Sequence, residues 1–596
     1  MKINRAAPIE RHIASQEFSK ALSLAESWAA ESATNPNAKY LCAVALIALG
    51  KFTAAISPLK QVLLLKPNMP EAHNNLGIAY KECGDVAAAE CHYRQAVELK
   101  PNFAEAWGNL AILSMERGKT DEALVLLEKA LSYDPKSPIV RLNIGIAYAA
   151  IGEYNKSVDF LEQSIGALPL NSEAHANLAH VLLTFGEFSA AWPEYEWRAE
   201  RRGTLKTPPK MPSLAELSGK NVRVTMEQGY GDLLQMSRYI PLLEQSAGEV
   251  LFEVPPLMTS LFEDGWPIKN KDFVHDFVIP NMSLPLLFNT TLETVPALTR
   301  PLSITPKIRK KWKNIIDSHA HRADAVKIGI AWAGSKTHRN DRNRSCSLVD
   351  FEPLYRIDGV HLFSLQVGEP AGQILDSKWE SIVDLGNSIN DFSDTAAAIS
   401  ELDLIVSVDT SIVHLAGTLG KDVWTVLPKA PDWRWMLDRD DSIWYPSLRI
   451  FRQKTSGDWT ELMLRVGAEA HNFVKRQLNK FDSAKTEIEA QLQNKELSQA
   501  IQNSRQIAEL LSNDLYVLNE IGVLFWNYGF PELALEFFNM ALAYDTDDRT
   551  TILNSYDVFN FYGLRDDAHL LVSNYLRSHP NDVQVHKLTH PKAIAA

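Results

Sequence analysis

The chain is poor in cysteine and contains no long apolar run. Its 596 residues include only four cysteines, and no two are spaced as CxxC. This argues against a disulfide framework and favours a reducing compartment. No apolar segment approaches the roughly 18–20 residues that cross a membrane. The opening MKINRAAPIERH also lacks the apolar core of a signal peptide. We therefore expect a cytoplasmic protein without a transmembrane segment.

Acidic residues outnumber basic ones, 73 to 60. The formal net charge is −13, which disfavours non-specific binding of the whole molecule to nucleic acid or an anionic membrane. The composition, 46% apolar and 22% charged, is that of an ordinary globular protein. At about 150 residues per domain, the length indicates roughly four domain-sized units.

What the sequence does contain is a repeat in its first third. Residues of three classes recur at a spacing of 34, namely Gly50, Gly84, Gly118, Gly152 and Gly186; Pro67, Pro101, Pro135 and Pro169; and Ala55, Ala89, Ala123, Ser157 and Ala191. This is the period of helix–turn–helix units that stack because one unit cannot bury its apolar face alone. The pattern resembles the tetratricopeptide repeat. The resemblance implies an α-solenoid over residues 1–200 whose groove binds a protein, the alternative being a scaffold or oligomerisation element.

Each residue class has a physical role in the predicted unit. Gly84 suits a left-handed turn between two helices, and Pro101 bars the second helix from continuing. The cysteines on repeat helices, Cys42, Cys83 and Cys91, are expected to be small buried apolar residues. This 34-residue spacing, called the lattice below, continues toward the N-terminus at Gln16 and Ala21. It also reappears late in the chain, at Gly529 and Gly563 and at Ala500, Ala534 and Ala568. We therefore expect a C-terminal helical repeat segment over residues 483–596.

Between the two repeat segments the pattern changes. Residues 198–214 are charged and then rich in proline, which indicates a linker. Afterwards short β-type runs alternate with helical segments, which predicts parallel sheets in two α/β units, at 214–305 and 320–470. A basic helical segment over 300–325 separates them. The predicted strands are 222–226, 249–254, 273–279, 326–332, 360–365, 402–408 and 423–427.

The first unit offers one candidate catalytic residue. A strand is followed by GYGDLLQM, in which Gly229 and Gly231 permit a tight turn before a helix. Asp232 then lies at the helix N-terminus. It is either a helix cap or a catalytic base that faces the cleft between the units.

The second unit carries two motifs that suit phosphate. The loop SKTHRNDRNRS follows a parallel strand and contains Lys336, Arg339, Arg342 and Arg344 with one acid, Asp341. Guanidinium groups at the carboxyl edge of such a sheet bind phosphate bidentately, although a solvated charged loop is the alternative.

Further on, the strand 402–408 delivers Asp409, Thr410 and Ser411 into a helix, whose N-terminal N–H groups can bind a phosphate oxygen. Asp409 could accept hydrogen bonds from sugar hydroxyls. His414 lies one turn later, and it either faces the cleft or packs within the helix.

These residues together resemble a known group. GYGD, the basic loop, Leu365–Gln366 at the end of a strand and SVDTSIVHLAGTLG look like the GT-B glycosyltransferases, with the nearest kinship to family 9, the lipopolysaccharide heptosyltransferases. Tetratricopeptide repeats joined to such a region resemble O-GlcNAc transferase in architecture. WRW at 433–435 and WYPSLRIFRQ at 444–453 look like the tail of bacterial repeat-bearing members, and Trp433, Trp435 and Trp444 either stack on the donor or belong to the core.

The resemblance assigns roles to individual residues. Asp232 matches the proposed general base. Arg342 or Arg344 falls near the phosphate-binding lysine of the family. Thr410 and Ser411 match the pyrophosphate-binding turn, although the family usually has glycine in place of Ser411. The remaining donor-side matches are Gly229, Gly231, Gln366, Asp409 and His414.

The implied fold is α plus α/β, with a central GT-B region of two Rossmann-like units, and the implied reaction is sugar transfer from a nucleotide-activated donor, with inversion as the family expectation. We find no DxD-like carboxylate pair at the predicted cleft and no His/Cys cluster with ligand spacing, so no metal or cofactor is expected. The long repeats favour a protein acceptor modified on Ser or Thr, with flagellin and a nonulosonic acid such as pseudaminic acid as the specific hypothesis. The alternatives are a lipopolysaccharide or glycan transferase and a noncatalytic repeat adaptor.

Overall fold

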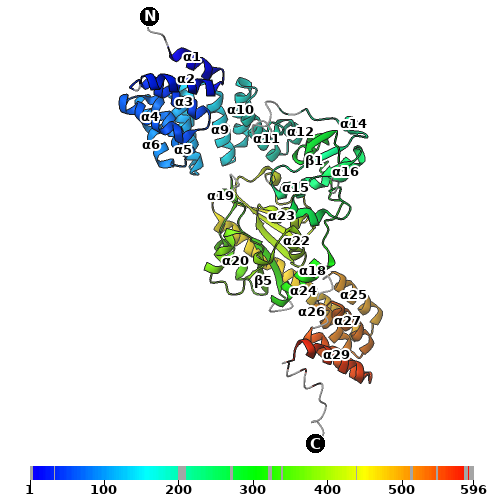
Figure 1. Ribbon diagram of the computed structural model, residues 1–596. Coiled ribbons are helices and arrows are strands. Elements are labelled where there is room, and N and C mark those ends of the chain that lie inside the picture. Colours follow the sequence, from blue (N-terminus) through cyan, green and yellow to red (C-terminus); the bar gives the residue numbers. More distant parts are fainter. Residues whose placement is uncertain are drawn as a thin grey trace.

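The computed structural model describes residues 5–580, except Ala33, 199–207, Pro209, 269–272, 320–324, 337–339, Asp438, 511–514 and 545–547, together with Asp582, Val585 and Leu588; side chains are not described at 476–482 and a few other helical positions. The predicted linker therefore lies mostly outside the described residues. Figure 1 shows a helical array at the N-terminal end, a central α/β body and a second helical array at the C-terminal end.

The N-terminal array consists of paired antiparallel helices. Its helices are α1 (Ala6–Ala14), α2 (Phe18–Glu31), α3 (Pro36–Ala48), α4 (Phe52–Leu65), α5 (Pro70–Glu82), α6 (Val86–Leu99), α7 (Ala104–Glu116), α8 (Thr120–Tyr133), α9 (Pro138–Ile151), α10 (Tyr154–Ala167), α11 (Ser172–Phe185) and α12 (Phe188–Tyr195). The five lattice glycines all adopt positive φ, between 69° and 85°, and Gln16 occupies the same slot with φ 58°. The small residues of the lattice, from Ala21 to Ala191, are fully buried. The left-handed turn predicted at the glycine position is confirmed.

The cysteines differ from expectation. Cys42 is buried, but Cys83 and Cys91 are exposed, and all four cysteines are free thiols. Cys83 is the C-cap residue of α5, beyond the buried stripe of that helix. Cys91 lies on α6 between the buried Ala89 and Tyr93, so it points to the opposite, solvent side.

The first α/β unit contains a small parallel sheet. Strand β1 (Val222–Thr225) lies between β2 (Val250–Phe252) and β3 (Phe277–Pro280), with Val222 beside Val250 and Phe277. Its helices are α14 (Leu214–Leu217), α15 (Tyr230–Met236), η1 (Ser237–Tyr239), α16 (Ile240–Ser246), η2 (Pro256–Phe262), η3 (Asn281–Ser283) and α17 (Leu284–Leu287).

The second unit has a six-stranded parallel sheet of order β6-β5-β4-β7-β8-β9. The chain starts at β4 in the middle and winds outward in both directions, which brings the ligand-binding edge to the carboxyl ends of β4 and β7. The strands are β4 (Val326–Ala331), β5 (Val360–Ser364), β6 (Val383–Asp384), β7 (Leu404–Val408), β8 (Val423–Leu427) and β9 (Leu448–Arg452). Strands β6 and β9 were not among the strands predicted from the sequence.

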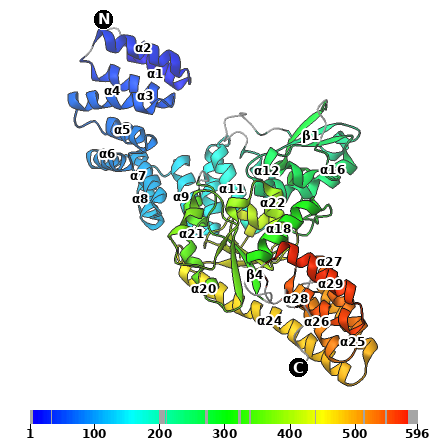
Figure 2. The same cartoon turned by 60° about the horizontal axis from the view of Figure 1, so that its bottom comes forward.

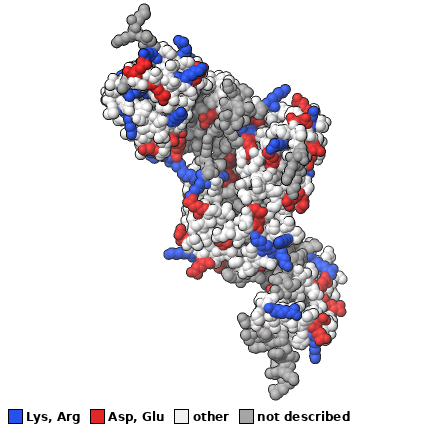
Figure 3. Space-filling view, in the orientation of Figure 1, with Lys and Arg blue, Asp and Glu red and all other residues white. Residues whose placement is uncertain are grey.

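Short helices connect these strands: α19 (Asp341–Arg344), η4 (Leu348–Phe351), α20 (Glu352–Tyr355), η5 (Glu369–Gly372), α21 (Gln373–Asp376), η6 (Gly386–Ser388), α22 (Phe392–Ser400), α23 (Ser411–Thr418) and η7 (Trp433–Trp435). The basic helix α18 (Pro306–His319) precedes β4 and packs on α22, since Trp312 Nε1 donates to Asp394 Oδ1 at 2.7 Å. Lys307, Lys310 and Lys311 of this helix are exposed, and Figure 3 shows a group of basic side chains on the central body beside the C-terminal array.

One continuous core joins both units to the last repeat. It includes Leu183 and Trp192 from α11 and α12, Val224 from β1, Leu415 from α23 and Trp444 from the segment before β9, all nearly inaccessible to solvent. The last repeat is therefore part of the central body.

The C-terminal array begins with a long helix. α24 (Trp459–Gln493, 35 residues) leaves the central body and leads into the remaining helices (Figure 2). These are α25 (Leu497–Leu510), α26 (Leu515–Asn527), α27 (Pro531–Tyr544), α28 (Arg549–Phe561) and α29 (Arg565–Ser578). Gly529 and Gly563 have φ 80° and 73°, and Lys495, one period earlier, has φ 61°. The late lattice therefore has the same turn geometry as the first.

Candidate functional site

The predicted phosphate-binding loops meet at the carboxyl edge of the larger sheet. Strands β4 and β7 are parallel neighbours, with Ala331 beside Ser407. The loops that follow them touch, because Arg344 Nη1 donates to the carbonyl oxygen of Asp409 at 3.1 Å. The Arg344 side chain is only 16% exposed, and its Nε also faces Asp341 Oδ1 at 3.4 Å. A Cβ at Gly334 would overlap the Arg344 guanidinium, so glycine is needed there for this packing.

The other basic residues of the loop lie elsewhere. Arg342 is exposed and reaches the repeat array, where a Cβ on Gly118 would come within 2.9 Å of its Nη2. Lys336 pairs with Glu369 at 2.6 Å, and both side chains are mostly exposed. Arg339 lies outside the described residues. Of the two arginines assigned to phosphate, Arg344 is therefore the one beside Asp409.

The helix that follows β7 presents an open N-terminus. Thr410 is the N-cap of α23 with φ −141° and makes no capping hydrogen bond through its side chain. Its Oγ1 instead lies 3.1 Å from Ser407 Oγ. Thr410 and Ser411 are both partly exposed. The first turn of α23 can therefore offer backbone N–H groups and the Ser411 hydroxyl to an anion.

Asp232 lies opposite, in the first turn of α15. Its Oδ2 accepts from the Gly229 N–H at 2.7 Å, and its Oδ1 accepts from Arg434 Nη2. Arg434 belongs to η7, after β8, so this ion pair crosses from the second unit to the first. Arg434 Nε also donates to Gln235 Oε1 at 2.9 Å and Nη1 to Asp432 Oδ1 at 2.6 Å. The carboxylate is thus both a helix cap and one half of an inter-unit ion pair.

Gly231 and His414 form a second contact between the units. A Cβ on Gly231 would lie 2.6 Å from His414 Cδ2, so only glycine permits α15 and α23 to approach this closely. His414 is 4% exposed and its Nδ1 pairs with Tyr445 Oη at 3.0 Å. Burial, aided by the charge of Arg434, lowers the pKa of His414 to about 3, so the imidazole is neutral. In this structure His414 lies in the joint between the units.

The two acids near Arg434 titrate in opposite directions. Burial, together with the charge of Asp432, raises the pKa of Asp409. Burial would also raise the pKa of Asp432, but the charge of Arg434 and a smaller contribution from His180 on α11 lower it overall. Asp432 is therefore the permanent counter-ion of Arg434, and Asp409 is the acid more ready to hold a proton.

Gln366 has a positioning role. Its Oε1 accepts from the N–H groups of Trp332 and Ala333 at 3.1 and 2.9 Å, and its Nε2 donates to the Ala333 carbonyl at 3.1 Å. It thereby ties the loop after β4 to the end of β5. Any contact with a donor stays a prediction.

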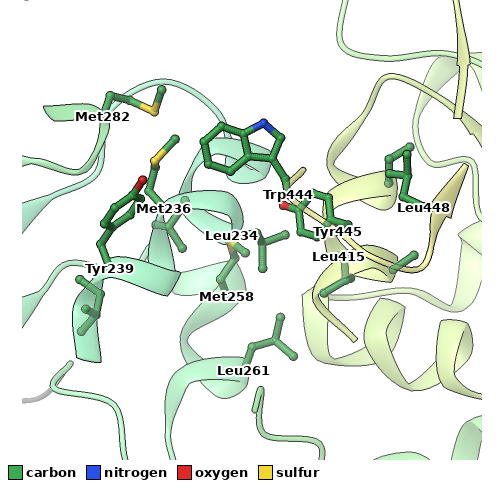
Figure 4. Packing of buried hydrophobic residues seen from close by; sticks show 14 of the residues in the cluster. Leu234, Met236, Tyr239, Met258, Leu261, Met282, Leu415, Trp444, Tyr445 and Leu448 are labelled. Atoms are coloured by element: carbon green, nitrogen blue, oxygen red, sulfur yellow. The ribbon is translucent and has the colours of Figure 1, made fainter. Parts of the chain in front are cut away.

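The tryptophans near the site belong to the core. Trp433, Trp435 and Trp444 are at most 2% exposed, so none offers an open stacking face. Figure 4 shows Trp444 and Tyr445 of the second unit directed toward Leu234 and Met236 of α15. Asp432 and Arg434 were not among the site residues predicted from the sequence. The sequence does carry a signal for them: an acidic and a basic residue alternate with tryptophans in a segment that begins five residues after the buried strand β8.

Within the described residues, no three His, Cys, Asp or Glu side chains are grouped so that they could hold a metal ion. Among the helices of the same residues, none combines the length and the apolar character needed to cross a membrane.

Models described as tetratricopeptide repeat or TPR repeat match residues 43–84, 70–103, 92–125 and 114–165. Protein FlbA of Caulobacter vibrioides is 25% identical over 329 residues, which are 49% of this chain and 54% of that protein. The chain therefore spans about half the length of this curated relative.

Two solved structures are each similar to about a third of this chain. A thermophilic TPR protein of Thermus thermophilus is 20% identical, with 31% of this chain and 100% of that one covered and a TM-score of 0.28. PilF of Pseudomonas aeruginosa is 17% identical, with 33% and 91% covered and a TM-score of 0.29. The family models confirm that the N-terminal array consists of tetratricopeptide repeats, which supports a role in binding another protein.

Proposed function

We propose that this chain is a glycosyltransferase that moves a sugar from a nucleotide-activated donor to Ser or Thr hydroxyls of a protein held by the repeats. The observation that carries the proposal is the arrangement at the sheet edge: a carboxylate on one unit lies opposite an arginine and an open helix N-terminus on the other. In this proposal the two α/β units form the GT-B region that the sequence resembles.

Each group has a part in the proposed reaction. The acceptor oxygen bonds to the anomeric carbon, and the bond from that carbon to the donor phosphate breaks with its electrons on the nucleotide. The hydroxyl proton passes to Asp232, whose oxygens each keep a lone pair beyond their present hydrogen bonds. Arg344 and the N-terminus of α23 stabilise the departing phosphate. Asp409, with its raised pKa, can pair with a sugar hydroxyl.

The repeats supply a surface for the acceptor. One further residue follows the 34-residue period: Asn75, Asn109, Asn143 and Asn177, each on the first helix of its pair. Three are partly exposed, and Asn143 is 8% exposed. An amide both donates and accepts, so a row of them can pair with an extended peptide backbone. We assign acceptor docking to this row.

The acceptor and donor follow from the family resemblance alone. On that basis the acceptor is flagellin and the donor a nucleotide-linked nonulosonic acid such as CMP-pseudaminic acid. The test is the intact mass of flagellin after incubation with the purified chain and a panel of nucleotide sugars. We expect a mass gain equal to whole sugars with one donor. No gain with any donor would contradict the proposal and favour a noncatalytic adaptor.

A further inference from the structure

Two strained residues flank the Asp232–Arg434 pair. Among the described residues, five that are not glycine have positive φ, and two of these are Gln228 (φ 68°) and Met436 (φ 53°). Gln228 comes four residues before Asp232, and Met436 comes two after Arg434. With ψ −162°, Met436 occupies a region that side-chain-bearing residues rarely adopt. Such conformations persist only where the surroundings hold them.

The last repeat holds the first of these residues. Gln228 Nε2 donates to Tyr195 Oη, on α12, at 2.7 Å. Tyr195 is 8% exposed, and its ring meets Trp433 edge-on with centroids 6.2 Å apart. Trp433 in turn lies against the Arg434 guanidinium, 4.4 Å from ring centroid to Cζ. One side chain of the repeat therefore contacts the segments that carry both members of the ion pair.

The same repeat also packs on the second strained residue. Gly186, the turn between α11 and α12, lies so close to Met436 that a Cβ there would be 2.8 Å from Met436 Cε. The carbonyl oxygen of Met436 accepts from Arg452 Nη2 at 2.9 Å. The turn of the last repeat and β9 thus enclose the backbone that follows Arg434.

We propose that the last tetratricopeptide repeat is part of the active site, with Tyr195 as a positioning residue. Tyr195 holds Gln228 in its left-handed conformation and braces Trp433, and this sets Asp232 against Arg434. Gly186 and Met436 fix the other end of the same arrangement. The inference rests on the proposed function for its kinetic readout, whereas its structural readout is independent of any reaction.

The test is a cycle of full-length variants: Tyr195→Phe, Gln228→Gly and the double variant. Tyr195→Phe removes only the hydroxyl that Gln228 requires, whereas glycine adopts positive φ without support. We expect Tyr195→Phe to lower kcat about tenfold with KM within twofold, and the double variant to match Gln228→Gly within threefold. An equal loss from Tyr195→Phe in both backgrounds would overturn the proposal.

Amide hydrogen exchange supplies the second readout. In Tyr195→Phe, exchange over 226–230 should quicken about tenfold while β4 stays unchanged. The matched control is Tyr40→Phe, whose hydroxyl accepts from Asn75 at 3.2 Å in an outer repeat and which should leave 226–230 as in the wild type. If the wild-type chain transfers no sugar, the proposed function fails while exchange still decides the inference. Unchanged exchange over 226–230 in Tyr195→Phe would refute it.

Discussion

Arg434 donates to Asp232 across 202 positions of sequence, from the segment after β8 to the first turn of α15. The same guanidinium holds Gln235 on α15 and Asp432 on its own loop. The proposed base is therefore placed by a residue of the opposite unit, and the ion pair serves both the joint and the site.

The first prediction concerns that arginine. Arg434 is 8% exposed, so Arg434→Ala leaves Asp232 and Asp432 without their cation in a largely buried site. We expect a loss of about 3–5 kcal/mol in the free energy of unfolding, measured as a lower midpoint in thermal unfolding. Arg356→Ala is the control, because Arg356, the C-cap residue of α20, forms an exposed ion pair with Glu352, the first residue of that helix. This variant should change the free energy of unfolding by less than about 1 kcal/mol. An equal loss of stability in the two variants would show that Arg434 does not hold the two units together.

The second prediction concerns pH. His414 has a folded-state pKa of about 3 against an ordinary value of 6.5. As pH falls below 6.5 the unfolded chain binds a proton that the folded chain does not, so stability is lost on acidification. Between pH 8 and pH 5 this amounts to about 2 kcal/mol. The raised pKa of Asp409 acts in the opposite direction, so the comparison must be with a variant.

His414→Gln supplies that comparison, because its amide can still pair with Tyr445. We expect the thermal midpoint of this variant to fall less than that of the wild type between pH 8 and pH 5. Parallel pH curves for the two proteins would show that His414 does not titrate in this way.

The third prediction separates backbone strain from packing. Gly50 and Gly186 both have positive φ, 69° and 85°. A Cβ at Gly50 meets nothing within 4 Å, whereas one at Gly186 would lie 2.8 Å from Met436 Cε and 2.9 Å from Leu292 Cδ1. Gly50→Ala should cost about 1 kcal/mol, and Gly186→Ala should cost more, because the ends of the Met436 and Leu292 side chains must also move. Thermal unfolding of both variants measures the difference, and equal midpoints would contradict the packing at Gly186.

The sequence predicts the local structure well, because periodicity and turn residues are local signals. The 34-residue lattice identifies the turns, including Gln16, and places the small buried residues. The run 423–427 matches β8 in full. Strand β6, with two residues, and β9, within a stretch taken for a family signature, carry no comparable pattern.

The interface between the last repeat and the two α/β units could not be predicted, because it depends on contacts between residues far apart in the sequence. Trp192 meets Trp433 edge-on with centroids 5.6 Å apart, and Arg342 extends from the loop after β4 to Gly118 of the repeat array. A helical pattern predicts that residues such as His414 are on a helix, but not that Gly231 from another unit covers the ring. The sequence therefore predicted the loops of the candidate site separately. It did not predict Arg434, which connects Asp232 of the first unit with the second unit.

The fourth prediction concerns acceptor docking. Asn75→Ala, Asn109→Ala and Asn177→Ala combined should weaken acceptor binding at least tenfold, because each removes an amide that could pair with a peptide. Donor affinity should be unchanged, since none of these residues belongs to the loops after β4 and β7 that are assigned to the donor. Both affinities can be measured by calorimetry. The control combines Asn68→Ala, Asn102→Ala and Asn155→Ala, which are exposed positions off the first helices. An equal loss of acceptor affinity in both triple variants would contradict the assignment of acceptor docking to the asparagine row.

The most direct test of the account is the transfer rate of Asp232→Asn at saturating donor and acceptor, followed by the intact mass of the acceptor. Asparagine keeps an oxygen for the Gly229 N–H but cannot take the acceptor proton. We predict donor affinity within threefold of the wild type and a transfer rate at least 100-fold lower. Turnover near that of the wild type would contradict the account and leave Asp232 as a helix cap.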